Sequence, residues 1–329
     1  ALGKEKIYRL DRHPSMLSHP VTPMHEADLT IHLSKQTNLP IGLVNILDIK
    51  QGPARIEKRI EEVVAENKPI IFFDCLHKED HANICEAVFH KQPETAFFIG
   101  SHEAASGLSA VLKASNLVKR KTHLGVKPEA GHRTQVLVLS GSCATITGRQ
   151  IAWSLKNGFT GTAVHTEDIL VKEKRVGERE RIIPAVLKEL AKGKSVIIHT
   201  AIGPEDKRIS AVTEKASSLG ISKGDMTGSI GDFLGEIAAG LIKKSGIRRI
   251  IIAGGDTSGK IQKHLNVEAL QIAVSFIDPA PLCYVYSRTK EFNGLEILFK
   301  GGQVGSLDYF EQISKAEIQP FSRIALGIL

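Results

Sequence analysis

Three short runs of apolar residues constrain the fold of this chain more than any other feature. The runs are Val136–Leu139, Val196–Ile198 and Ile250–Ile252, and no polar residue interrupts them. A strand with one face in water alternates apolar and polar residues, so unbroken runs predict strands that are buried on both faces. Longer amphipathic segments separate the runs. The pattern therefore predicts α/β layers with largely parallel sheets.

The same criteria place the remaining elements along the chain. Strands are predicted at Ile41–Ile49, Pro69–Cys75, Thr95–Gly100, Gln135–Gly141, Ser195–Thr200, Arg248–Gly255, Ala269–Phe276, Leu282–Ser287 and Leu295–Lys300. Helices are predicted at Pro23–Gln36, Ala54–Glu66, Glu79–His90, Ala104–Ala114, Gly148–Asn157, Arg181–Lys192, Asp206–Leu219, Met226–Lys244 and Leu307–Ser314. Thr22 followed by Pro23 predicts the cap and first turn of the first helix.

A polar stretch near residues 118–134 interrupts the pattern. It holds two glycines and one proline and has no hydrophobic period. Such a segment is typical of a linker between compact units. The chain is therefore predicted to form two α/β domains, residues 1–130 and 131–329.

Composition narrows the class of protein. Of the 329 residues, 42% are hydrophobic and 24% charged, and no window holds 18 consecutive apolar residues, which predicts a soluble chain without membrane spans. Four scattered cysteines do not form a disulfide framework and favour a reducing cytoplasm. The net charge of +7 comes with only 5% aromatic residues, which is poor material for stacking bases. An anionic small molecule accounts for the charge without nucleic acid.

The segment Ala253–Gly259 carries the strongest functional signal. It follows a buried strand, and its paired glycines let the backbone approach a ligand where a side chain would clash. Asp256, Thr257 and Ser258 are expected to supply capping oxygens and free amides at a helix start, where an anion is stabilised. The segment predicts a phosphate-binding turn, although an ordinary tight turn has the same local pattern.

Two further turns follow other predicted strands. In Lys300–Gly305, a lysine beside paired glycines could place a positive charge on a phosphate; the alternative is a strand exit with a solvated lysine. In Leu139–Thr145, a Ser-Gly-Ser sequence supplies small hydroxyls and a flexible backbone. A nucleophilic role for Cys143 is disfavoured because no histidine lies near it in the sequence. In open α/β sheets such turns gather at one edge, where ligands bind.

Other polar groups have simpler explanations. Cys75, His77, His81 and Cys85 resemble a zinc set, but a buried cysteine and surface histidines fit the segment better, so no metal-ligating residues are assigned. Asp74 and the expected turn at Ser106–Leu108 could line a pocket or simply cap and pack. His199, at the end of a buried run, is more typical of a satisfied core histidine.

Taken together, these segments resemble the four-carbon acid sugar kinases, which phosphorylate tetronates such as threonate, erythronate or their 3-oxo forms with ATP. The motifs that carry the resemblance follow one another in the family order over nearly the whole chain. They are His19–Leu29, Val138–Cys143, Ala253–Gly259, Pro279–Leu282 and Lys300–Gly305.

The resemblance implies an N-terminal domain for the acid sugar and a C-terminal domain for the nucleotide, with Mg²⁺ as the accompanying cation. The residues implied at the ATP site are Ser140, Gly141, Ser142, Ala144, Gly254, Gly255, Asp256, Thr257, Ser258, Lys300, Gly301, Gly302 and Gly305. Asp256 is the best carboxylate at the phosphate end, as a metal or water ligand or as the catalytic base.

The sequence also departs from the family pattern. An Asp-Asp-Leu-Thr-Gly-Ala motif and a Lys-x-Asp-Ser-Thr-x-Arg-Gly segment are absent, so the N-terminal domain is expected to be incomplete. Ala144 replaces a serine common in the family, and Pro279–Pro281 replaces a Pro-Gly-x-Pro sequence. The alternative function is a nucleotide-binding remnant or regulatory module without turnover. A nicotinamide-dependent dehydrogenase lacks the Gly-x-Gly-x-x-Gly turn it would need. Exposed sheet edges suggest a homodimer.

Overall fold

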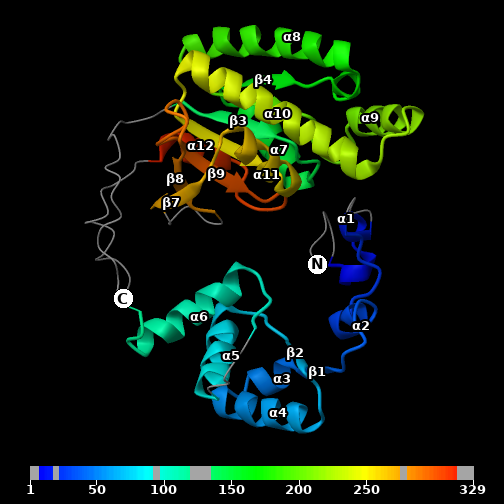
Figure 1. The fold of residues 1–329 in the computed structure, drawn as a ribbon, viewed down its shortest axis with the longest axis vertical. Helices are drawn as coiled ribbons and strands as arrows, with labels where there is room; N and C mark the ends of the chain where they lie inside the picture. Colours follow the sequence, from blue (N-terminus) through cyan, green and yellow to red (C-terminus); the bar gives the residue numbers. More distant parts are fainter. Residues whose placement is uncertain (1–6, 18–21, 92–96, 119–134, 275–279, 317–329) are drawn as a thin grey trace. The chain divides into compact units, whose positions relative to one another are not determined.

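The structure is a computed structural model that describes residues 7–17, 22–91, 97–118, 135–274 and 280–316. The chain divides into two compact units, Ala1–Val126 and Lys127–Leu329 (Figure 1). Residues 119–134, most of the predicted linker, lie outside the described residues. None of the helices in the described part of the chain is both long and apolar enough to span a membrane.

The first unit pairs a small parallel sheet with helices. Its elements are η1 (Leu10–Arg12), α1 (Pro14–Leu17), α2 (Leu29–Ser34), β1 (Ile41–Val44), α3 (Ile46–Ile49), α4 (Pro53–Ala65), β2 (Ile70–Phe73), α5 (Lys78–His90) and α6 (His102–Ala114). Strands β1 and β2 run parallel, with Ile41 opposite Ile70. Helix α4 packs closely on β1, because a Cβ at Gly42 would lie 2.1 Å from Val63 Cγ1.

Several predictions in this unit are wrong. The strand predicted at Ile41–Ile49 ends at Val44, because the Asn45 side chain accepts hydrogen bonds from Leu47 N and Asp48 N and starts α3. The helix predicted at Pro23–Gln36 begins at Leu29 instead, since the Asp28 carboxylate caps it by accepting from Thr30 N and Ile31 N.

Two further segments differ from expectation. The strand predicted at Thr95–Gly100 lies partly outside the described residues, and its described part, 97–100, is irregular. No described strand pairs with this part, and its Phe97 and Ile99 are 91% and 92% exposed. The turn expected at Ser106–Leu108 lies inside α6, where Gly107 allows close packing: a Cβ there would lie 2.7 Å from the His81 carbonyl oxygen.

The second unit is a mixed sheet between two layers of helices. Its strands are β3 (Leu137–Ser140), β4 (Thr160–Ala163), β5 (Val196–His199), β6 (Arg249–Ala253), β7 (Ala269–Val274), β8 (Leu282–Tyr286) and β9 (Glu296–Lys300). Among the described residues they form one sheet in the order β4-β5-β3-β6-β9-β8-β7. In this order, β4, β5, β3, β6 and β9 run parallel to one another, whereas β8 pairs antiparallel with both β9 and β7. The predicted α/β class with largely parallel sheets is confirmed.

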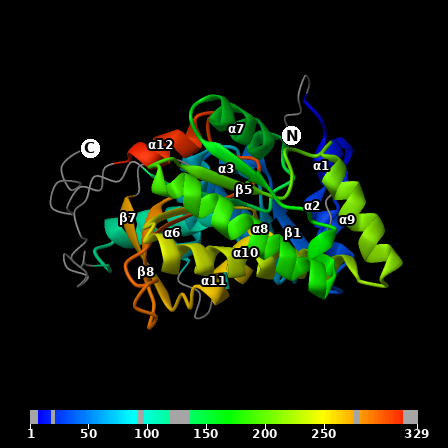
Figure 2. The ribbon, with the colours of Figure 1, turned by 90° about the horizontal axis from the view of Figure 1, so that it is seen from above.

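The helices of this unit cover both faces of the sheet. They are α7 (Thr145–Lys156), η2 (Asp168–Leu170), α8 (Lys172–Ala191), α9 (Lys207–Ser218), α10 (Lys223–Ser245), α11 (Gly255–His264) and α12 (Tyr309–Lys315). Figure 2 shows α7 and α12 on one side and α8, α10 and α11 on the other. Alternate residues of each strand pack on opposite layers: Ile250 and Ile252 join the core with α8 and α10, and Ile251 joins the core with α7 and α12.

Strand β4 was not predicted from the sequence. Its sequence, Thr-Gly-Thr-Ala, has no apolar run, and it lies at the edge of the sheet beside β5. An edge strand needs less burial than a central one, so the pattern that found the central strands does not find it.

Candidate functional site

Three strands of the second unit end at the same level of the sheet. Ser140 at the end of β3 lies opposite Ala253 at the end of β6, and Ala253 lies opposite Lys300 at the end of β9. The three glycine turns predicted from the sequence follow these strands directly. The expectation that the turns gather at one edge of the sheet is therefore confirmed.

The chain leaves neighbouring strands at this edge toward opposite faces. Strand β3 leads through its turn to α7 on one face, and β6 leads to α11 on the other (Figure 2). Where adjacent connections diverge in this way, the sheet edge is left open between them, which is where ligands bind in open α/β sheets. The structure thus places the turns after β3 and β6 at such a point.

We number the turns in chain order: the first follows β3, the second follows β6 and the third follows β9. The Thr257 side chain holds the first two turns together. A Cβ at Gly141 would lie 2.3 Å from Thr257 Cγ2, and a Cβ at Gly254 would lie 2.9 Å from Thr257 Oγ1. Gly254 also has a φ of +127°, a conformation that other residues rarely adopt. Both positions therefore require glycine, and the buried Thr257 side chain fills the space between the turns.

The third turn packs on the first. A Cβ at Gly302 would lie 2.8 Å from Ala144 Cβ and 3.0 Å from Ser142 Oγ. Backbone hydrogen bonds join the same strands at this edge: Gly141 N donates to Ala253 O, and Gly254 N donates to Lys300 O, both at 3.0 Å. The three turns therefore form one contiguous surface, which we call the glycine edge: residues 140–144, 254–258 and 300–305.

Helix α11 begins at this edge without a side-chain cap. Its N-cap is Gly254, and no side chain in the described part of the chain accepts a hydrogen bond from the amides of its first turn. The sequence predicted that Asp256, Thr257 and Ser258 would supply capping oxygens, and for two of them this is wrong. The hydroxyls of Thr257 and Ser258 instead donate to the Gly254 carbonyl, at 3.2 and 2.6 Å. Amides at the helix start thus remain available to an anion.

Helix α7 begins in a similar way. Its N-cap is Ala144, whose side chain makes no capping bond. One amide of its first turn, Ile146 N, donates weakly to Gln303 Oε1 of the third turn, at 3.4 Å. The amide of Ala144 donates to Ser142 Oγ at 3.2 Å. Helices α7 and α11 follow the neighbouring strands β3 and β6, so both helices start at the glycine edge. Their dipoles can therefore act on one ligand.

The side chain of Lys300 is buried rather than exposed at the edge. It is 1% exposed, and its Nζ donates to Thr147 Oγ1 at 2.9 Å and to Gly301 O at 2.8 Å. Burial lowers the pKa of Lys300 to about 8. The sequence left two alternatives for Lys300, an ammonium group that contacts a phosphate or a side chain in solvent. The observed position differs from both, because the charge lies beneath the turn.

The other predicted site residues differ in exposure. Exposed positions are Gly255, Asp256 and Gly301; partly exposed positions are Gly141, Ala144, Ser258, Gly302 and Gly305; buried positions are Ser140, Ser142, Gly254, Thr257 and Lys300. Asp256 lies in the first turn of α11, and no hydrogen bond or ion pair engages it within the described residues. The described residues hold no cluster of three or more histidine, cysteine, aspartate or glutamate side chains that could hold a metal ion.

The glycines of α10 that position α11 were not predicted from the sequence. A Cβ at Gly231 would lie 2.9 Å from Lys260 Cβ, and one at Gly235 would lie 2.4 Å from His264 Cδ2. Asp232, between these glycines, pairs with Lys260 at 3.0 Å. The signal in the sequence is the spacing of Gly228, Gly231 and Gly235, which puts them on one face of the helix.

A buried histidine lies next to the glycine edge. His199, at the end of β5 and opposite Ser140, accepts at Nδ1 from Arg208 Nη2 at 3.2 Å. Burial, together with the charge of Arg208, lowers the pKa of His199 to about 4, so the ring is neutral at pH 7.

Desolvation and Asp206 raise the pKa of the Cys143 thiol, which leaves it an unactivated nucleophile. Both observations agree with the sequence-based interpretation.

Polar groups of the first unit serve mainly in packing. Asp74 Oδ2 accepts from Ile46 N at 3.1 Å and so holds the start of α3. Cys75 Sγ lies 3.7 Å from His81 Nδ1, while Cys85 Sγ contacts the Ala104 carbonyl oxygen at 3.7 Å instead of joining them. Asp80 is buried, and its carboxylate accepts a hydrogen bond from Lys50 Nζ. This hydrogen bond lowers the pKa of Asp80 to about 2.

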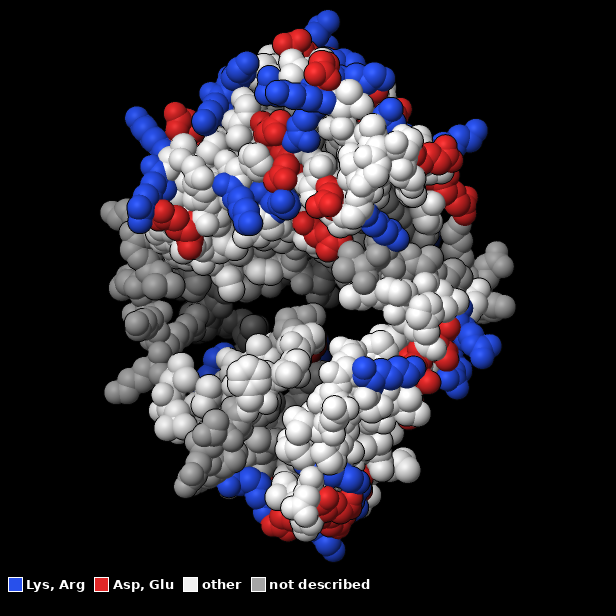
Figure 3. Space-filling view, turned by 45° about the vertical axis from the view of Figure 1, so that its right-hand side comes forward, with Lys and Arg blue, Asp and Glu red and all other residues white. Residues whose placement is uncertain are grey.

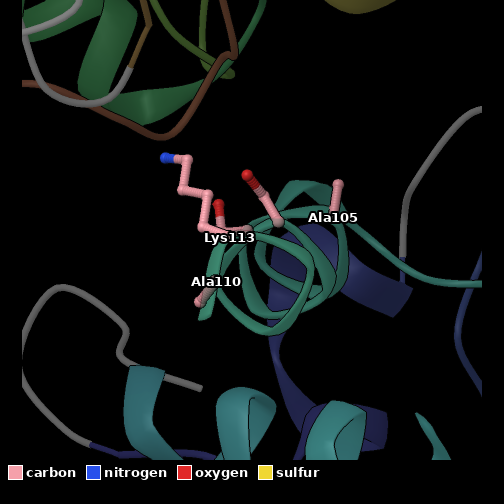
Figure 4. Close-up of a pocket in the computed structure, with 5 residues that line it drawn as sticks. Ala105, Ala110 and Lys113 are labelled. Atoms are coloured by element: carbon pink, nitrogen blue, oxygen red, sulfur yellow. The ribbon is translucent and has the colours of Figure 1, made fainter. Parts of the chain in front are cut away.

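A shallow hollow runs along the exposed side of α6. Its lining residues are Ala105, Ser106, Ser109, Ala110 and Lys113 (Figure 4). All of them come from one helix, and the Lys113 side chain extends away from the helix. A single helix side with one charge offers few converging polar groups, so the hollow has less of the character of a binding site than the glycine edge.

The charges of the surface are mixed in sign. On the face that Figure 3 shows, lysine and arginine side chains lie interspersed with aspartate and glutamate. A surface that binds nucleic acid through its phosphates concentrates basic groups in a patch or stripe. The visible face has no such concentration among the described residues.

Comparison with protein families identifies both units. Residues 137–310 match the model of a nucleotide-binding C-terminal domain, and residues 5–110 match that of a sugar-binding N-terminal domain. The chain is 32% identical to 3-oxo-isoapionate kinase of Paraburkholderia graminis over 94% of this chain and 65% of that protein. It is 29% identical to 3-oxo-tetronate kinase of Pseudomonas savastanoi pv. phaseolicola, over 91% of this chain and 64% of that protein.

Solved structures show the same fold at lower sequence identity. Crystal structures of proteins from Salmonella typhimurium LT2 and Haemophilus influenzae are each 20% identical to the chain, with TM-scores of 0.60 and 0.55. Each match covers 92% of this chain and 66% of the other. The chain thus spans about two thirds of the length of the relatives that it matches.

Proposed function

Because the chain belongs to the four-carbon acid sugar kinase family, we propose that it transfers the γ-phosphoryl group of ATP to a hydroxyl of a four-carbon acid sugar. The relatives named above are kinases of 3-oxo acids, which favours a 3-oxo-tetronate or a related 3-oxo acid as the substrate. The second unit would hold the nucleotide, and the first unit the acid sugar.

The glycine edge is the observation that carries this proposal. It joins three glycine turns at the carboxyl ends of adjacent parallel strands, and two helices start there from N-cap residues whose side chains make no capping bond. Backbone amides at such starts bind phosphate groups, and the glycines leave the backbone accessible. A Cβ at Gly255 would have no neighbour within 4 Å, so open space lies beside the turn. The buried hydroxyl of Ser140 has no hydrogen-bond partner in the described part of the chain.

These residues also fit a magnesium–nucleotide complex. Mg²⁺ is commonly held by one or two carboxylates, with water and substrate phosphates completing its coordination. Asp256 is an exposed carboxylate in the first turn of α11, next to the turn proposed to hold the phosphates. When bound, Mg²⁺ would neutralise charge on the phosphates. We assign Asp256 to this cation or to the water molecules around it.

The reaction needs positioning more than covalent chemistry from the protein. The substrate hydroxyl forms a bond to the γ-phosphorus as the bond to the β-phosphate oxygen breaks, and the hydroxyl proton passes to a base. In this proposal the amides of the glycine edge hold the phosphates. If water molecules alone coordinate the cation, the Asp256 carboxylate is available as the base.

The test is an ADP-formation assay with a panel of tetronates and 3-oxo acids. ATP-dependent turnover of at least one acid, with no ADP formed when the acid is omitted, is the expected result. ADP binding without turnover of any acid would contradict the kinase assignment and favour a nucleotide-binding module. The variant Asp256→Asn should lose turnover while it keeps its folded circular dichroism spectrum, and unchanged turnover would remove Asp256 from the proposal.

A further inference from the structure

Four carbonyl oxygens, three in the third glycine turn and one on Ser306 directly after it, point toward the interior of the protein. Gly301 O accepts from Lys300 Nζ at 2.8 Å, and Gly302 O accepts from Thr147 Oγ1 at 2.7 Å. Gln150 Nε2 donates to Val304 O at 3.0 Å and to Ser306 O at 2.7 Å. The donors are three buried polar side chains beneath the turn, Thr147, Gln150 and Lys300, which we call the carbonyl clamp.

The three donors support one another. Thr147 Oγ1 accepts from Lys300 Nζ at 2.9 Å and donates its own proton to Gly302 O. A lysine nitrogen has only donors, so it suits a place surrounded by a hydroxyl and carbonyl oxygens. Thr147 and Gln150 lie three residues apart on the inner side of α7, and Lys300 ends β9. The clamp therefore ties the turn to one helix and one strand that are rigid parts of the fold.

The direction of these carbonyls fixes the direction of the amides. A trans peptide is planar, and its N–H points away from its C=O. Since the carbonyls of Gly301, Gly302 and Val304 point inward, the N–H groups of the following residues, Gly302, Gln303 and Gly305, point outward. Within the described residues, none of these three amides donates to another group. Amides that point outward from neighbouring positions of a turn can bind an anion.

Glycine is required where this arrangement is tightest. Gly305 has a φ of +88°, and a Cβ there would lie 3.1 Å from Gln150 Nε2. At Gly302, a Cβ would lie 3.0 Å from Ser142 Oγ of the first turn. The clamp thus holds a backbone shape that a side chain would disturb, and it keeps the turn against the rest of the glycine edge.

We propose that Thr147, Gln150 and Lys300 are positioning residues that orient the amides of Gly302, Gln303 and Gly305 toward the phosphates of a bound nucleotide. The proposal rests on the nucleotide site proposed above and adds residues that do not touch the ligand. Fixed donors need no reorganisation when the anion arrives, which is why the clamp affects affinity and not only stability.

The test compares Thr147→Val with Thr147→Ser and Ser154→Ala. Valine keeps the shape of threonine but removes the hydroxyl, whereas serine keeps the hydroxyl. Ser154 is the matched control, because it is buried in the same helix and its hydroxyl has no partner within the described residues. The affinities for ADP and for adenosine are measured by calorimetry at a temperature at which all variants are folded.

The expected result is a loss of about tenfold in ADP affinity for Thr147→Val, the loss that about one buried hydrogen bond accounts for. Thr147→Ser and Ser154→Ala keep wild-type ADP affinity, and all variants keep wild-type adenosine affinity, because only the phosphates reach the turn. In wild-type protein, ADP slows hydrogen exchange in peptides that contain residues 302–305.

Each other outcome overturns a defined part of the proposal. Unchanged ADP affinity in Thr147→Val, or a wild-type turn that ADP does not protect, overturns the positioning role while the nucleotide site stands. An equal loss of adenosine and ADP affinity shows that the turn does not read the phosphates and overturns the role as stated. Wild-type protein that binds no ADP overturns the proposed function itself.

Discussion

Two neighbouring glycines in the turn after β6 have different physical roles. Gly254 has a φ of +127°, and a Cβ there would lie 2.9 Å from Thr257 Oγ1 and 3.3 Å from Ser142 N, so its lack of a side chain maintains the fold. Gly255 has an ordinary φ and open space around it, so its lack of a side chain keeps that space available to a ligand. Only the second kind of glycine can be changed without disturbing the protein itself.

The stability of variants at these two positions should therefore differ. Gly254→Ala is expected to lower the free energy of unfolding by about 1–3 kcal/mol, through strain and contact with Thr257 Oγ1. Gly255→Ala, in the first turn of α11, is expected to leave the free energy of unfolding unchanged or to raise it by up to about 1 kcal/mol. Urea denaturation followed by circular dichroism measures both. Equal effects would show that the turn is not held as described.

Lys300 carries a pH dependence that follows from its burial. The folded protein releases this proton near pH 8, whereas the unfolded chain keeps it until a pH near 10.5. Between these values the unfolded state binds more protons, so the free energy of unfolding rises with pH by an amount on the order of 3 kcal/mol for this group. Urea denaturation of wild type and Lys300→Met between pH 7.5 and pH 10 tests this. The wild type should gain stability relative to the variant as pH rises; a constant difference would contradict it.

Helix α11 depends on α10 for its place at the glycine edge. Gly231 and Gly235 let the two helices approach, and the pairing of Asp232 with Lys260 joins them. The start of α11 carries Gly255 and Asp256, so the position of this helix sets where the proposed phosphate contacts lie.

Two alanine substitutions on α10 separate close packing from helix propensity. In Gly235→Ala the new Cβ would lie 2.4 Å from His264 Cδ2, and overpacking of this kind costs about 1–3 kcal/mol of unfolding free energy. In Gly228→Ala the nearest atom is Lys260 Nζ at 3.7 Å, an ordinary contact, so alanine should be neutral or stabilising. Thermal unfolding measures the pair. Gly235→Ala as stable as Gly228→Ala would mean that the helices are not packed this closely.

Local patterns in the sequence predict the elements that depend on local forces. The central strands and the three glycine turns were predicted because buried strands and tight turns have compositions of their own. Strand β4 was missed because an edge strand needs no apolar run, and the early end of β1 was missed because one side chain, Asn45, decides it.

Contacts between distant segments could not be predicted from the sequence alone. Thr147 and Gly302, which are hydrogen-bonded, are 155 residues apart in the chain. The buried Lys300 side chain donates to Thr147 of α7, 153 residues away in the chain, and no local pattern specifies that contact. The sequence therefore predicts which turns share an edge, whereas only the structure reveals the side chains that hold them.

The whole chain consists of two units with separate cores. The core of the first unit gathers around Val44, Ile49 and Ile56, and the second unit has one core on each face of its sheet. The family matches assign a sugar-binding domain to the first and a nucleotide-binding domain to the second. The proposed transfer begins with a nucleotide held at the glycine edge of the second unit, and every later step depends on that binding.

The most direct test of nucleotide binding at the glycine edge is calorimetric titration of ADP into wild type, Gly255→Val and Gly259→Val. Both glycines lie in α11 with no neighbour within 4 Å of an added Cβ, so valine costs the helix a similar amount at either position. We expect wild type and Gly259→Val to bind ADP with the same affinity, while Gly255→Val stays folded and gives no binding heat. ADP binding by Gly255→Val with wild-type affinity would contradict the proposed site.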